Sequence, residues 1–172
     1  MDLPYFRALA RYNRWANGVL FEACTRLPQE EYFKTRPAFF KSIHGTLNHI
    51  LLVDRIWLGR ATAKPVPPLP LNQILYGDFL GLKVARAAKD DTIVNALDNM
   101  SEGEAAKEMT FTRSNGMTMR MEMRFMLGHM FNHATHHRGQ VHDMLSQTAL
   151  PPPSLDLFVY VLATKAGDAP GR

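Results

Sequence analysis

Apolar residues recur every three or four positions over long stretches of this chain, which is the spacing of amphipathic α-helices. In the first stretch the repeating positions are Tyr5, Leu9, Tyr12, Ala16, Val19, Ala23 and Leu27. Pro4 suits the first turn of a helix, Asp2 can cap it, and Pro28 ends the pattern. We therefore predict a first helix from about Leu3 to Arg26.

A second helix is predicted after a loop that runs through Lys41. Ser42 is a suitable cap, and the pattern continues to about Arg60. One face carries Ile43, Leu47, Ile50, Leu51 and Leu58, and another carries His49, Leu52, Val53 and Ile56. A helix that is apolar on two sides packs between neighbours, so His49 can face the interior. His44 lies nearer the polar edge, and periodicity alone does not decide whether His44 or His49 belongs to a site.

The pattern of residues changes twice in the middle of the chain, from proline-rich to helical and then to alternating. Residues 61–70 are rich in proline and cannot be helical, so they form either an ordered surface crossover or a lid beside a site. A third helix is predicted over residues 71–100, broken near Gly77 or Gly81. Residues 107–121 alternate around Asn115 and Gly116, which is typical of a β-hairpin.

A last long helix is predicted from about Arg120 to Gln147, before the three prolines at 151–153. Residues 156–162 form a short helix or strand, and the tail after Lys165 is expected to fray. Together these elements predict an all-α fold: a four-helix bundle with long crossovers, and a small β-hairpin before the last long helix. We expect residues 1–172 to form one domain.

Five of the seven histidines lie in the last long helix, at positions 129, 133, 136, 137 and 142. Its buried stripe is marked by Met126, Met130, Val141 and Met144. His133 and His137 fall at the centre of that stripe, one turn apart, so both can bind one metal ion. His129 and His136 fall on its flank. The alternative is that these are ordinary core or surface histidines, since two ligands do not make a metal site.

A third ligand would have to come from the second helix. Asp54 is a candidate fourth ligand or an acceptor for a histidine N–H, but a simple ion pair with a nearby arginine is the favoured interpretation. His136, Asp54 and Gln140 lie in the right region to act as a general base, and none is compelling.

Composition narrows the possible partners and the cellular location of the protein. The net charge is +4, but the basic residues are scattered, so nucleic-acid binding is not favoured. Cys24 is the one cysteine and is expected to be a packing residue, and no disulfide can form within the chain. The sequence shows no signal peptide and no apolar run long enough for a membrane span. We therefore expect a cytoplasmic protein.

Three segments resemble motifs of the DinB family of bacterial damage-inducible proteins. They are Tyr12–Asn17, then Leu47–Ile50 followed by Asp54 and Trp57, and finally Asn132–Gln140, which is the most specific. The resemblance implies a four-helix bundle that binds one divalent metal ion through three histidines. By position these would be His49, His133 and His137, which selects His49 over His44. It also implies a homodimer.

The resemblance further suggests a class of reaction, because related proteins include thiol-dependent S-transferases and isomerases that use bacillithiol or mycothiol. Three histidine ligands leave a coordination position open, as in catalytic metal sites. We therefore expect a metal-dependent thiol S-transferase acting on a small molecule with a low-molecular-weight thiol, with zinc or nickel as the metal. The alternatives are a non-catalytic metal-binding stress or damage-response protein, and a metal-dependent hydrolase.

Overall fold

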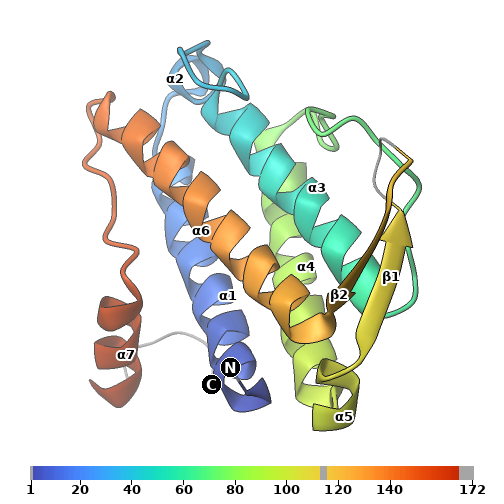
Figure 1. Cartoon of the computed structure of the whole chain (residues 1–172). Coiled ribbons are helices and arrows are strands. Elements are labelled where there is room, and N and C mark those ends of the chain that lie inside the picture. Colours follow the sequence, from blue (N-terminus) through green and yellow to red (C-terminus); the bar gives the residue numbers. More distant parts are fainter. Residues whose placement is uncertain (1, 113–115, 167–172) are drawn as a thin grey trace.

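Four long helices pack side by side as a bundle in the computed structural model, which describes residues 2–112 and 116–166 (Figure 1). They are α1 (Leu3–Thr25), α3 (Ile43–Ala61), α4 (Phe79–Asn99) and α6 (Met123–Ser146). Helix α1 packs against α4 and α6, and α3 packs against the same two helices. The expected all-α bundle is thereby confirmed. Among the described residues, no helix combines the length and apolar character that crossing a bilayer requires.

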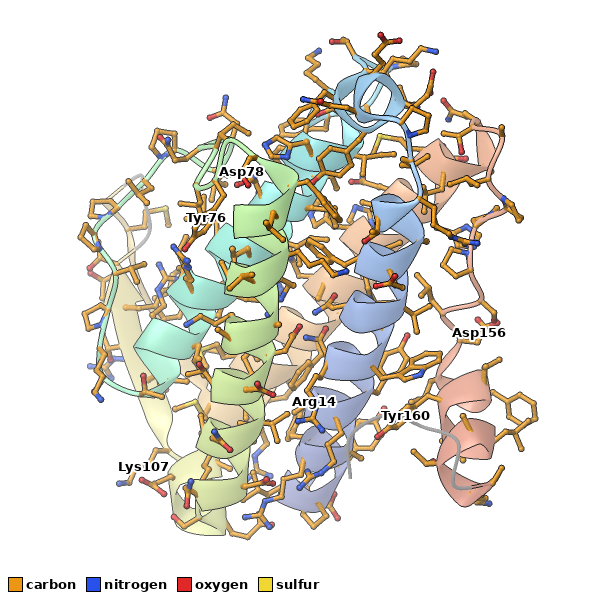
Figure 2. All side chains as sticks on the ribbon, turned by 180° about the vertical axis from the view of Figure 1, so that it is seen from behind. Arg14, Tyr76, Asp78, Lys107, Asp156 and Tyr160 are labelled. Atoms are coloured by element: carbon orange, nitrogen blue, oxygen red, sulfur yellow. The ribbon has the colours of Figure 1, made fainter. Side chains whose placement is uncertain are left out.

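Shorter elements connect and flank the bundle. Helix α2 (Gln29–Phe33) lies in the first crossover, and α5 (Glu102–Ala105) precedes the hairpin of β1 (Glu108–Thr112) and β2 (Thr118–Glu122). The two strands are antiparallel, as predicted, and the central turn residues 113–115 lie outside the described part of the chain. The last predicted element is a helix, α7 (Leu157–Ala166). Its Tyr160 side chain lies between α7 and α1 (Figure 2). The Tyr160 ring contacts Tyr12 and Trp15 of α1.

Side-chain caps mark the starts of α1, α3 and α4. Asp2 accepts a hydrogen bond from the backbone amide of Tyr5, and Ser42 accepts one from Gly45, as the sequence predicted. The predicted start of the third helix at Leu71 is wrong, because α4 begins at Phe79 under its cap Asp78. The last long helix likewise begins at Met123 rather than Arg120, since residue 120 is paired within the hairpin.

Two apolar clusters fill the bundle, one around Phe6, Leu97 and Met126 and the other around Leu20, Leu47 and Met144. A layer of buried polar side chains occupies positions between these clusters along α1, α3, α4 and α6. Its members are Asn13, Asn17, Asp54, Arg86, Asp90 and Arg138.

Arg86 is the centre of this polar layer. Its guanidinium donates to Asp54 at 2.6 Å and to Asp90 at 2.8 and 3.0 Å. Asn17 donates to Asp90, and Arg138 donates to the amide oxygen of Asn13. Asp54 therefore makes the ion pair with an arginine that the sequence favoured, and the layer links all four long helices.

Candidate metal centre

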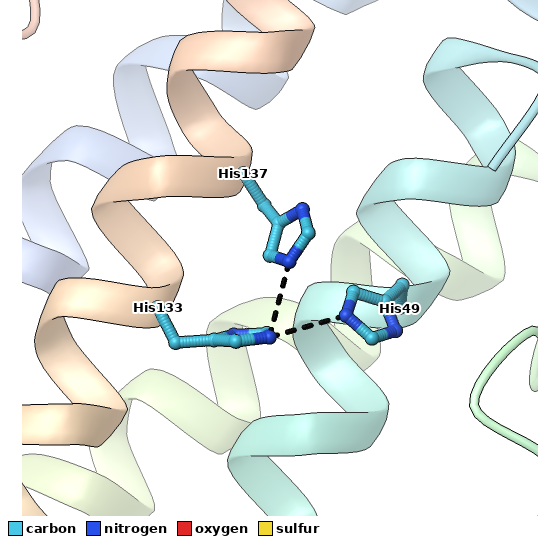
Figure 3. A group of neighbouring side chains, drawn as sticks. All are labelled: His49, His133 and His137. Carbon is cyan, nitrogen blue, oxygen red and sulfur yellow. Dashed lines mark hydrogen bonds between the residues drawn. The ribbon is translucent and has the colours of Figure 1, made fainter. Parts of the chain in front are cut away.

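Three histidine side chains converge between α3 and α6. The Nε2 atom of His133 lies 3.2 Å from Nε2 of His49 and 3.1 Å from Nε2 of His137 (Figure 3). His133 and His137 are one turn apart on α6, and His49 reaches them from α3. Within the described part of the chain, these three residues are the group of potential metal ligands that comes together.

The spacing of the three nitrogens suits a small divalent cation. Zinc binds imidazole nitrogen at about 2.0–2.1 Å, so two such ligands at a tetrahedral angle lie about 3.4 Å apart. The separations of the other two nitrogens from Nε2 of His133, 3.2 and 3.1 Å, are close to this value without any rearrangement of the helices. All three ligand atoms lie within 4.8 Å of one another.

Hydrogen bonds at the far side of two rings orient their lone pairs. We assign Nδ1–H of His49 as the donor to the backbone carbonyl of Leu71, at 2.8 Å. Nδ1–H of His137 likewise donates to Oε1 of Gln140, at 2.8 Å. A neutral imidazole protonated at Nδ1 has a free lone pair at Nε2, which is the form that binds metal.

This assignment leaves an imbalance that a cation would remove. The Nε2 lone pairs of His49 and His137 both face Nε2 of His133, which can donate at most one proton. The other nitrogen of His133, Nδ1, is buried and has no hydrogen-bond partner among the described residues. The donor set therefore fits a metal ion better than it fits a closed hydrogen-bond network.

Burial keeps the three rings uncharged. It lowers the pKa of His49 to about 4 and that of His133 to about 3, and it also lowers the pKa of His137. Neutral imidazole is the ligating form, so protons compete little with a metal at neutral pH.

The other histidines near this site lie outside the cluster. The ring of His129 is 5.8 Å from that of His133, and it packs on Trp57. His136 is exposed, and its Nε2 lies 3.2 Å from the amide nitrogen of Gln140. Gln140, considered as a general base, is instead the acceptor that orients His137.

His44 is buried rather than near a polar edge, so that part of the sequence interpretation is wrong. Its ring nitrogens face Tyr32 and Asn48 at 3.1 and 3.2 Å. The irregular segment before α4 covers this side of α3, because Asn48 accepts hydrogen bonds from the amides of Leu75 and Tyr76.

Two contacts at the centre were missed by sequence reasoning. Leu71 contributes a backbone carbonyl from an irregular segment, and Phe40 stacks on His49 from the loop before α3. Neither residue has a periodic pattern or a motif that could reveal its role.

The geometry describes a four-helix bundle with a three-histidine cluster on two facing helices. The family model described as "DinB family" matches residues 2–168, and the chain belongs to this family. It is similar to the protein named "Protein DinB" from Bacillus subtilis (strain 168). The two are 25% identical over 177 residues, which cover 94% of this chain and 96% of that relative.

Proposed function

We propose that this protein binds one divalent metal ion through His49, His133 and His137, with zinc or nickel as the metal. The observation that carries the proposal is the convergence of three Nε2 atoms, two of them oriented by hydrogen bonds at Nδ1. Imidazole nitrogen suits both metals, and three ligands leave room for a further one.

Metal analysis of two histidine variants tests the ligand assignment. After dialysis, the wild-type protein should retain about one metal ion per chain, a number set by three ligands that share one ion. His133→Ala should lose it, because it removes the nitrogen that faces both other ligands. His129→Ala is the matched control, since it changes a histidine one turn away that lies outside the cluster. Equal metal loss in both variants would contradict the assignment.

As the activity of this centre, we propose transfer of a low-molecular-weight thiol to a small electrophilic substrate. A bound metal would supply a Lewis acid that lowers the pKa of a coordinated thiol and so produces thiolate at neutral pH. The chain itself would keep a proton on Nδ1 of His49 and of His137, because these atoms donate to the Leu71 carbonyl and to Gln140, and this aims both Nε2 lone pairs at the centre. Burial keeps both rings neutral. The resemblance to thiol-dependent relatives supports this choice.

An activity panel separates the proposed function from its alternatives. Metal-loaded protein should conjugate a thiol such as bacillithiol or glutathione to a chlorinated arene. A carbon–sulfur bond forms, the carbon–chlorine bond breaks, and chloride and the thiol proton are released to solvent. Activity should disappear on chelation and in His137→Ala. Turnover of esters or amides instead would favour a metal-dependent hydrolase. A metal-loaded protein that converts nothing in either panel would favour a non-catalytic stress-response role, in which the ion stabilises the fold.

We also propose that the protein is a homodimer, on the resemblance alone. Light scattering of the purified protein, combined with size-exclusion chromatography, would give its mass. A mass equal to one 19.5 kDa chain at micromolar concentration would contradict the homodimer.

A further inference from the structure

Phe40 makes ring contacts with two of the three clustered histidines. Its ring is stacked on that of His49, with centroids 3.8 Å apart and planes inclined by 20°. It also meets the His137 ring edge-on at 5.5 Å. The side chain is 9% exposed although it comes from a loop, so it is part of the wall around the cluster.

The backbone around Phe40 is held in an unusual conformation. The next residue, Lys41, has φ of 67°, in the left-handed region that L-amino acids other than asparagine and aspartate rarely adopt. A side chain at Gly45 would overlap the carbonyl oxygen of Phe40, so this loop can approach α3 only because residue 45 is glycine. Strained backbone of this kind gathers at functional sites, where the surrounding structure maintains it.

A buried arginine stabilises the same loop through hydrogen bonds. Arg36 is 6% exposed, and its guanidinium donates to the carbonyls of Glu31 and Lys34 and to the Glu31 carboxylate. Its backbone amide donates to the carbonyl of Lys41 at 2.6 Å. The loop is therefore fixed from both sides of Phe40, which keeps the ring against His49.

We infer that Phe40 is a positioning residue of the metal centre, whose ring sets the plane of the His49 imidazole and shields His49 and His137 from water. The inference rests on the proposed function. The hydrogen bond from His49 to Leu71 fixes one ring atom but still allows the ring to tilt about that bond. A ring stacked at 3.8 Å removes this freedom. An apolar cover also restricts the access of water and protons that compete with the ligands.

Cobalt(II) is a suitable probe, because its visible spectrum reports ligand geometry directly. We expect Phe40→Ala to change the cobalt spectrum and to weaken cobalt binding about 10–100-fold, the usual effect on affinity of losing a group that orients a ligand. The weaker binding should appear as faster release of cobalt to a chelator. Phe39→Ala is the matched control, because its ring is 80% exposed and packs on Phe40. It should keep the wild-type spectrum and a release rate within about twofold, since it touches no ligand directly.

Two further substitutions separate ring stacking from simple bulk. Phe40→Tyr keeps a flat ring and should retain the wild-type spectrum, whereas Phe40→Leu keeps apolar bulk and should not. A leucine variant with the wild-type spectrum and release rate would overturn the positioning role. A Phe40→Ala variant that behaves like Phe39→Ala would also overturn the positioning role. If Phe40→Ala does not fold, as judged by circular dichroism of the metal-free protein, the tyrosine and leucine variants still decide the question.

The same experiment keeps the two proposals apart. A wild-type protein that binds no cobalt would refute the proposed metal centre before any variant is compared. A wild-type protein that binds one cobalt ion, with all Phe40 variants unchanged, would refute the positioning role alone.

Discussion

Replacing Arg86 by methionine should strongly destabilise the fold. The Arg86 side chain is 3% exposed, and it bridges Asp54 and Asp90, which are 1% and 3% exposed. Arg86→Met keeps an apolar stem of similar shape but leaves two buried carboxylates without their cation. Breaking a buried ion pair in this way costs about 3–5 kcal/mol. In a chain of this size, that loss lowers the melting temperature by roughly 6–20 °C.

The loss of folding stability in Arg86→Met should be smaller at low pH than at neutral pH. Burial raises the pKa of Asp90 to about 6, although Arg86 opposes this rise. A carboxyl group whose pKa is higher in the folded state than in the unfolded chain contributes stability at low pH, and this is lost as pH rises through the folded value. Without Arg86 the pKa values of Asp54 and Asp90 should rise further. The deficit of Arg86→Met relative to wild type should therefore shrink between pH 7 and pH 5.

Urea unfolding of metal-free protein at both pH values would measure this deficit. Arg11→Met is the matched control, because Arg11 pairs with Asp98 where the two side chains are 40% and 37% exposed. Such surface pairs contribute at most about 1 kcal/mol. A deficit for Arg86→Met no larger than that of the control, or one that grows towards pH 5, would refute the reasoning.

Three further substitutions test the surroundings of the cluster. Gln140→Ala removes the acceptor for Nδ1 of His137 and should weaken metal binding about 10–100-fold in a competition titration, while Gln140→Glu should keep it. Asn48→Ala removes the acceptor for two backbone amides before α4, and it should lower the unfolding free energy by about 1–3 kcal/mol in urea. Lys41→Gly should raise the unfolding free energy by up to about 1 kcal/mol, because glycine adopts φ of 67° without strain; a clear loss would contradict this.

Sequence periodicity located the bundle because its long helices each bury one or two apolar faces. It could not locate the start of α4, where the residues from Leu71 onwards contain apolar positions that suit a helix. The structure replaces that helical turn with tertiary hydrogen bonds. Asn48 accepts from the amides of Leu75 and Tyr76, and Asp78 then caps the helix. The Asn48 contacts join residues 27 and 28 positions apart in the chain, so they leave no local pattern.

The histidine pair on α6 was accessible to sequence analysis for a simple reason: both residues lie on one stripe of one helix. Sequence analysis could not choose between His44 and His49, because α3 is buried on several sides and both rings face the interior. The family resemblance selected His49, and the structure places that residue beside His133 and His137. The orienting groups, Phe40 and the Leu71 carbonyl, come from irregular segments and became visible only in three dimensions.

The helices and the loops make separate contributions to the metal centre: one to the stability of the bundle, the other to the orientation of the ligand rings. Asp54 and Arg138 belong to the polar layer, and they lie on the same two helices as the clustered histidines, close to them in sequence. The layer connects α3 to α6 through Arg86, Asp90 and Asn17 of the other two helices, so it contributes to the stability of the bundle rather than to the orientation of the histidine rings. Phe40 and Leu71 act on the orientation of the His49 ring, and Phe40 also covers the His137 ring. It follows that Arg86→Met, once folded with saturating cobalt, should show the wild-type spectrum despite its low stability. Phe40→Ala should show the reverse: an altered spectrum in a protein that remains folded.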